Sequence, residues 1–142
     1  MNEKIGSTAN YLAALFYLTF GMIYLFKNSF MPYHSEALSL DWKEVESSTQ
    51  FLILAFMRAV SGGFIAESIV VIVLQRKFTL TKISWIPLLI LATGLIVSFT
   101  SLYATMIVRL NSPGKPPTVM AIVGIVLLIV GYIFNQITLK SK

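Results

Sequence analysis

The sequence predicts an all-α membrane protein, a bundle of four transmembrane helices. Of its 142 residues, 56% are apolar and only 12% are charged, and the mean hydropathy is +0.79. These values lie outside the range of soluble globular domains. Most apolar residues fall in four long runs, and a helix needs about 20 residues to cross a bilayer core. We therefore expect one domain over residues 1–142, with no room for a soluble catalytic domain.

The apolar runs set the expected spans. They are Ala9–Phe26, Phe51–Leu74, Trp85–Ile107 and Thr118–Leu139.

Composition excludes several functions. The chain has no cysteine, so disulfides, thiolate metal sites and cysteine nucleophiles are excluded. The net charge is +5, but the basic residues flank the apolar runs instead of forming a patch with aromatic residues. We therefore expect no nucleic-acid partner. No metal-binding motif is present, and no cofactor is expected.

Charge asymmetry predicts the orientation. Four spans place the N-terminus, the expected loop 75–84 and the C-terminus on one side, which then carries six basic residues against four on the other. Short basic loops favour the cytoplasm. We expect both termini to be cytoplasmic, in a bacterial cytoplasmic membrane.

The connector between the first two spans is expected to lie outside and to fold over the bundle. It holds four of the six acidic residues. Asp41 and Glu44 have the spacing of a capping box, as do Ser47 and Gln50, so a short interfacial helix is expected in the second half of this connector. The first half contains Pro32, which predicts a turn.

Small and polar residues at helical spacing predict the inward faces of the spans, because helices in lipid associate through such residues. The first span has Asn10, Tyr17, Gly21 and Tyr24. The third and fourth spans show similar stripes: Gly94, Ser98, Ser101 and Thr105, and Ala121, Gly124, Gly131, Asn135 and Thr138.

The second span carries two charges, Arg58 and Glu67, which are costly at membrane depth and mark a functional or packing site. They flank a strip of small residues that we expect to face the other helices. The strip consists of Ala55, Ala59, Gly62, Gly63 and Ala66.

The two charges are too far apart for a direct ion pair, at about 13 Å along the axis, so each needs its own partner. We expect Arg58 near Thr100, Ser101 and Tyr103, with Glu36 or Glu46 reaching in from the loop. Glu67 should lie level with Tyr17, Thr93, Tyr132 and Asn135.

Each candidate residue has a functional and a structural interpretation. Glu67 would bind a proton or cation, or would tie helices together through hydrogen bonds. Arg58 would hold an anionic group, or would extend to the interface. Tyr17 and Tyr24 would line a ligand cavity, or would only pack.

His34 and Glu36 are candidates for acid–base or metal chemistry at the membrane surface. A metal site needs more ligands at fitting spacing, so a structural role for His34 is favoured.

The stretch Met31-Pro32-Tyr33-His34, then Trp42, then Arg58 followed by Gly62-Gly63, resembles small four-span bacterial membrane proteins of unassigned function. The resemblance implies fold and location only. Small multidrug exporters have a similar size but carry their essential carboxylate in the first span, and this chain departs from that pattern.

The leading hypothesis is binding or passage of a small ligand, lipid or proton at a polar intramembrane site. Its residues are Arg58, Glu67, Tyr17, Tyr24, Ser101, Tyr103, Asn135, His34 and Glu36. The alternative is a non-catalytic accessory or assembly subunit, and a membrane-surface enzyme using His34 and Glu36 ranks third. Membrane lipid is the expected partner, and the sequence is compatible with either a monomer or a homo-oligomer.

Overall fold

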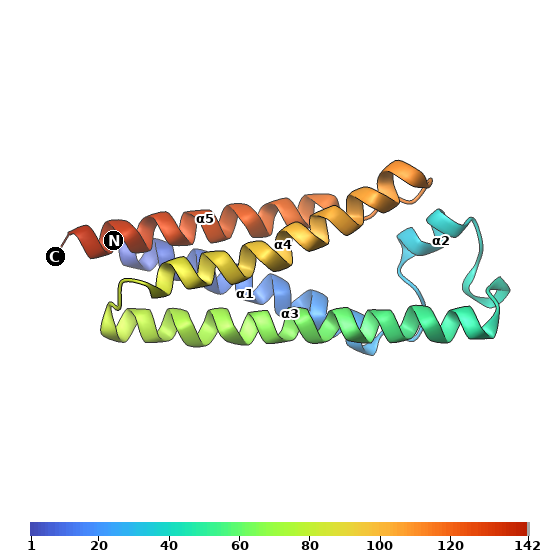
Figure 1. Cartoon of the computed structure of the whole chain (residues 1–142), viewed down its shortest axis with the longest axis horizontal. Helices are drawn as coiled ribbons and strands as arrows, with labels where there is room; N and C mark the ends of the chain where they lie inside the picture. The colour runs from blue at the N-terminus through green and yellow to red at the C-terminus, as the bar shows by residue number, and fades with distance from the viewer. Residues whose placement is uncertain (142) are drawn as a thin grey trace.

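The computed structural model describes residues 1–141, whose regular elements are all helical. Four long helices form a bundle, and two short elements lie in the first connector (Figure 1). The elements are α1 (Asn2–Phe26), α2 (Pro32–Leu38), the 3-10 turn η1 (Trp42–Glu44), α3 (Ser47–Thr81), α4 (Ile86–Asn111) and α5 (Thr118–Lys140).

The long helices pack in an up-and-down arrangement. α1 packs against α3 and α5, and α4 packs against α5 and α3. The N-terminus, the C-terminus and the α3–α4 connector lie at one end of the bundle, hereafter the termini end, while α2 lies at the opposite end, hereafter the α2 end (Figure 1). The expected helical bundle is confirmed.

All four long helices are long and apolar enough to span a membrane. The chain is therefore a multi-pass membrane protein. α3 is the longest, with 35 residues, which corresponds to roughly 52 Å of helix and exceeds a bilayer core of about 30 Å.

Three of the four expected inward faces are confirmed. Asn10, Tyr17 and Gly21 are buried on α1, and Gly94 and Ser98 are buried on α4. On α5 the buried positions include Gly124, Gly131, Asn135 and Thr138.

The inward face expected for the second span is wrong. Ala55, Ala59, Gly62, Gly63 and Ala66 are all exposed, and a Cβ added at either glycine would meet nothing within 4 Å. The inward face instead carries larger and more polar side chains, because α3 meets its neighbours through hydrogen bonds as well as apolar contacts. Its buried residues are Met57, Ser61, Glu67, Ser68, Val71, Gln75 and Phe78.

The expected loop 75–84 is also largely wrong, since α3 continues to Thr81. Gln75 and Phe78 are completely buried, so tertiary packing holds these turns in the helix despite their polar sequence. α3 ends at Lys82, which has a left-handed backbone (φ 53°), and its N–H donates to the Phe78 carbonyl.

The first connector folds differently from the expectation. Its helix, α2, occupies the first half, where Pro32 is the first helical residue. This position favours proline, because its fixed φ suits a helix start and its missing N–H is not needed there. The Asp41–Glu44 capping box is present but closes only the single turn η1, and Gln50 is hydrogen bonded to the Trp42 and Val45 carbonyls.

Candidate functional site

A buried polar cluster joins three helices toward the termini end. Gln75 on α3 accepts hydrogen bonds at Oε1 from Nδ2 of Asn10 (2.7 Å) and from Nδ2 of Asn135 (2.8 Å). Each of these three side chains is at most 1% exposed. Asn135 was expected level with Glu67, but its hydrogen-bond partner is Gln75, two turns further along α3.

Two glycines make room for the asparagines. A Cβ at Gly131 on α5 would collide with Oδ1 of Asn10, and a Cβ at Gly6 on α1 would lie 2.5 Å from Oδ1 of Asn135. Each of the two helices thus offers a glycine to the other helix's asparagine, with the same four-residue spacing in Gly6–Asn10 and Gly131–Asn135. Both Oδ1 atoms lack a conventional hydrogen-bond partner within residues 1–141, and their position against glycine Cα atoms suits weak Cα–H···O contacts.

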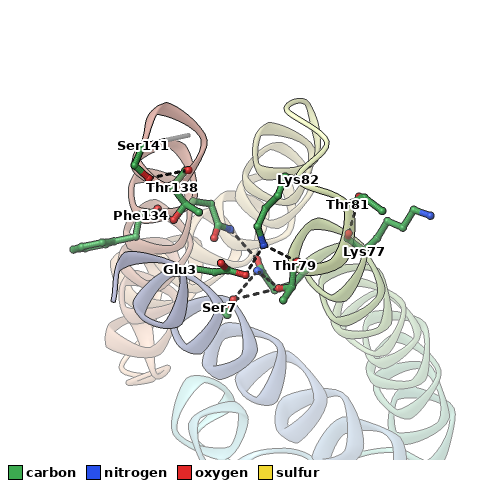
Figure 2. Close-up of polar contacts among 11 residues, drawn as sticks. Glu3, Ser7, Lys77, Thr79, Thr81, Lys82, Phe134, Thr138 and Ser141 are labelled. Carbon is green, nitrogen blue, oxygen red and sulfur yellow. Dashed lines mark hydrogen bonds and ion pairs between the residues drawn. The ribbon is translucent and has the colours of Figure 1, made fainter.

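The cluster continues to the surface at the termini end. Gln75 Nε2 donates to Ser7 Oγ at 2.9 Å and to Thr79 Oγ1 at 3.4 Å. Lys82 Nζ lies 2.5 Å from Glu3 Oε1 and also donates to the Thr79 carbonyl (Figure 2). These contacts fasten α1 to the end of α3.

Gln75 was expected to lie in a loop, so its place on the inner face of α3 was not predicted. The signal was present as a seven-residue spacing of polar residues, Ser61, Ser68 and Gln75, all of which are buried on one face of α3. The run of small residues gave a stronger but misleading pattern.

Glu67 and Arg58 have separate partners, as expected. Glu67 is 7% exposed, and its Oε1 accepts a hydrogen bond from Thr93 Oγ1 at 2.9 Å. Thr93 was among the expected neighbours. Tyr17, also expected near this depth, instead hydrogen bonds to Ser98 Oγ (2.8 Å) and donates to the Gly94 carbonyl (3.0 Å).

Arg58 closes the end of α1. Its guanidinium donates to the carbonyls of Tyr24 (2.6 Å) and Lys27 (2.8 Å) and, at 3.3 Å, to Oδ1 of Asn28. The last carbonyls of a helix have no partner within the helix and favour a nearby cation. The hydrogen-bond partners of Arg58 therefore lie on α1 and its C-terminal loop, not on the third span or the acidic loop as expected.

α1 is shorter than α3 and ends before it reaches the α2 end of the bundle, which leaves space there between the other helices. Since Arg58 lies level with the end of α1, the preceding residues of α3 extend beyond it by about 16 Å. α3 and α4 diverge toward the α2 end, and α2 lies between them (Figure 1). The space left beyond α1 is only partly filled.

The result is a cavity of about 430 Å³, hereafter the apolar cavity. Its wall is mainly apolar, and two of its lining residues, Phe56 (62% exposed) and Val60 (47%), also reach the outer surface of α3. The lining residues are Tyr24 on α1, Tyr33, His34, Ala37 and Leu38 on α2, Ile53, Phe56, Met57, Val60 and Phe64 on α3, and Ser101, Ala104, Thr105 and Val108 on α4.

A second, smaller cavity of about 80 Å³ is lined by residues of all four long helices. Tyr24, Phe64 and Thr105 line both cavities. Phe64 also packs against Tyr17 with ring centroids 6.2 Å apart. The expected tyrosine stripe of α1 therefore does border internal space.

α2 covers one side of the apolar cavity and is fixed at two points. Tyr33 and Tyr24 hydrogen bond through their hydroxyls at 2.5 Å, and the Glu36 carboxylate accepts a hydrogen bond from the Lys115 backbone N–H at 2.9 Å. Gly114 lies so close that a Cβ there would be 2.7 Å from the Tyr33 carbonyl oxygen. α2 thus bridges the end of α1 and the α4–α5 loop.

His34 lines the apolar cavity, and its ring packs edge to face against Tyr33 and Phe30. Its Nδ1 accepts the Met31 N–H at 3.3 Å. Burial lowers the pKa of His34, and burial raises the pKa of Tyr33. Within residues 1–141, no three His, Cys, Asp or Glu side chains come together as metal ligands.

The two remaining candidates, Ser101 and Tyr103, differ in position. Ser101 lines the apolar cavity while its hydroxyl donates to the Val97 carbonyl. Tyr103 was expected to face the interior, but it is 70% exposed. The nine sequence-predicted residues therefore do not form one site. Tyr24, His34 and Ser101 line the apolar cavity, Glu67 and Tyr17 lie at mid-bundle, and Asn135 belongs to the polar cluster. Arg58 contacts the end of α1, Glu36 contacts the α4–α5 loop, and Tyr103 is exposed.

The fold and these contacts define a multi-pass α-helical membrane protein with an apolar cavity at one end. No family model, curated protein or solved structure matches the chain.

Proposed function

We propose that this protein binds an apolar molecule, such as a lipid chain or a hydrophobic small molecule, in the apolar cavity. The observation that carries the proposal is the cavity itself, about 430 Å³ of mainly apolar lining. Ligand sites are typically concave and apolar, with a few polar groups that orient the ligand. Here the polar lining residues are Tyr24, Tyr33, His34, Ser101 and Thr105.

The lateral opening supports a ligand that arrives through the bilayer. Phe56 and Val60 line the cavity and are exposed on the outer surface of α3, a helix long and apolar enough to span a membrane. A hydrophobic molecule would therefore enter from the bilayer without crossing water.

Photo-cross-linking with a diazirine-bearing fatty acid tests the proposal. In the wild-type protein we expect labels at Met57 inside the apolar cavity and at the lipid-facing Val73. Ala104→Trp fills the cavity and should remove the label at Met57 while keeping the label at Val73. Ala92→Trp, on the exposed face of the same helix, serves as the control. Unchanged labelling at Met57 in Ala104→Trp would favour the accessory-subunit interpretation.

A second candidate function is supported at Glu67. Its carboxyl is almost completely buried and hydrogen bonds to Thr93, and the single ion pair within residues 1–141 is Lys82–Glu3, so Glu67 has no cation partner there. Such a carboxyl is suited to bind a proton or a monovalent cation. Infrared difference spectra between two pH values should contain a carboxyl band that Glu67→Gln lacks. Identical spectra would argue for a packing role.

The proposed orientation keeps both termini in the cytoplasm of a bacterium. The basic residues of the α3 end, Arg76, Lys77 and Lys82, support it. Cysteine labelling from outside should modify Ser39→Cys and spare Ser84→Cys, both at exposed positions. The opposite pattern would reverse the topology.

A further inference from the structure

A third cavity, hereafter the basic cavity, lies beside the apolar cavity at the α2 end. It has a volume of about 370 Å³ and is formed by the end of α4 and the α4–α5 loop, from Arg109 to Pro116. Arg109 and Lys115 are its charged residues.

Gly114 separates the two cavities. It lines the basic cavity, and a Cβ at this position would lie 2.9 Å from Ala37 Cβ and 3.1 Å from Val108 Cγ1, both of which line the apolar cavity. Val108 and Arg109 are consecutive on α4, so one helix turn contributes to both cavities. A single molecule of lipid length has room to contact both.

The cations of the basic cavity keep most of their hydrogen-bonding capacity. Within residues 1–141, the Arg109 guanidinium uses one of its five N–H groups, in a long hydrogen bond of 3.5 Å to Thr118 Oγ1. The Lys115 ammonium forms no hydrogen bond or ion pair within residues 1–141. One acid contacts this loop, Glu36, whose carboxylate accepts the Lys115 backbone N–H, so Arg109, Lys115 and Glu36 together carry a net positive charge.

We propose, resting on the proposed function, that the ligand is an anionic phospholipid, with its chain in the apolar cavity and its phosphate in the basic cavity beside Arg109 and Lys115. Arginine and lysine both recognise phosphate, arginine through a planar fork and lysine as a point charge. Arg109 lies in the last turn of α4 and Lys115 in the loop before α5, so both cations lie where spanning helices end, which is the expected level of lipid headgroups.

Native mass spectrometry of the full chain in detergent tests this assignment. The probes are dioleoylphosphatidylglycerol, dioleoylphosphatidylcholine and glycerol 3-phosphate. The first two share their chains and differ in net charge, and the third is the headgroup chemistry without chains. We expect the wild-type protein to bind dioleoylphosphatidylglycerol, the anionic lipid, more tightly than dioleoylphosphatidylcholine, the choline lipid. It should bind glycerol 3-phosphate only weakly.

The variants are Arg109→Gln and Lys115→Gln, with Lys43→Gln as the matched control, since Lys43 is exposed at the same end but lines neither cavity. A basic residue near an anionic lipid contributes about 1 kcal/mol, so each cavity variant should lose roughly fivefold in affinity for the anionic lipid. Affinity for the choline lipid should not change, and Lys43→Gln should behave like wild type.

Each other outcome overturns a specific statement. The headgroup assignment would be overturned if wild-type protein bound both lipids equally. It would also be overturned if Lys43→Gln lost as much affinity for the anionic lipid as the cavity variants do. In either case the apolar cavity would still be a site for the lipid chain. Glycerol 3-phosphate that binds as tightly as the anionic lipid would assign the basic cavity to a soluble anion instead. Binding of neither lipid would overturn the phospholipid assignment, whereas absence of the fatty-acid label at Met57 in the wild-type protein would overturn the proposed function itself.

Discussion

Asn10 on α1 and Asn135 on α5 donate hydrogen bonds to the same atom, Oε1 of Gln75 on α3, at 2.7 and 2.8 Å. One amide oxygen therefore joins three helices. Its two accepted hydrogen bonds use both lone pairs of the carbonyl.

Replacing Gln75 with leucine should weaken the bundle. Both asparagine amides would lose their acceptor in a water-free interior, at a cost of about 1–3 kcal/mol, because buried donors without partners are expensive. Hydrogen bonds in membranes average only ~0.6 kcal/mol each, so the lower part of this range is the expectation. Unfolding in mixed micelles measures the change. Gln136→Leu should have little effect, because Gln136 is half-buried and its side chain forms no hydrogen bond within residues 1–141.

The glycines of the bundle should divide into two groups. Gly131→Ala and Gly6→Ala each force a Cβ onto an asparagine of the facing helix, and overpacking of this kind typically costs about 1–3 kcal/mol. Gly62→Ala and Gly63→Ala meet open space, and alanine favours helix by up to ~1 kcal/mol over glycine. Folded yield and melting temperature should fall in the first pair and hold or rise in the second. A reversed order would place the small-residue strip of α3 inside the bundle.

Arg58→Leu should loosen the end of α1. The carbonyls of Tyr24 and Lys27 would lose their donor, and an unpaired buried acceptor costs about 1–3 kcal/mol. Hydrogen exchange should increase for the amides at the end of α1 and in the following loop. Arg76→Leu removes an exposed arginine from the same helix and controls for charge. Unchanged exchange in Arg58→Leu would mean that water or lipid replaces the guanidinium.

Acid should destabilise the α2 end through His34. Burial holds the pKa of the folded-state imidazole below its ordinary value of 6.5, so the unfolded state binds more protons at low pH. The contribution of His34 to stability is therefore complete above pH 6.5 and is lost as the pH falls from 6.5 toward the folded-state pKa. Tyr33 stays neutral in this range, because burial raises the pKa of its hydroxyl.

The difference in melting temperature between wild type and His34→Gln reports this effect. When the pH is lowered from about 8 to about 5, the melting temperature of the wild-type protein should fall relative to that of His34→Gln. Only the histidine gains a charge in the cavity wall over this pH range. Parallel pH profiles would show that His34 is hydrated in the folded protein.

The sequence predicted the elements of the fold better than their faces. Long apolar runs and helical stripes on the first, third and fourth spans are strong signals because one side of each helix is nearly free of polar residues. On α3, small residues on the lipid-facing side competed with polar residues on the inner side, and the rule that small residues mark interfaces chose the wrong side. The polar stripe Ser61, Ser68 and Gln75 was the better guide.

The apolar cavity could not be predicted from the sequence, because it depends on relative helix lengths. It exists because α1 ends at Phe26 while α3 begins at Ser47 and extends past that end. Tyr24, His34 and Ser101 were selected for their chemistry, but only the divergence of α3 and α4 brings them to one space. The partners of Arg58 were missed for the same reason, since the end of α1 lies beside its guanidinium only in the assembled bundle.

The central claim is that the apolar cavity holds an apolar molecule, and ligand retention tests it most directly. Wild-type protein and Ala104→Trp are purified through the same detergent exchange and compared by native mass spectrometry. We predict that wild-type protein keeps one bound lipid-sized molecule, that Ala92→Trp keeps it too, and that Ala104→Trp loses it while remaining folded. Equal retention by wild type and Ala104→Trp, or none in either, would contradict the account.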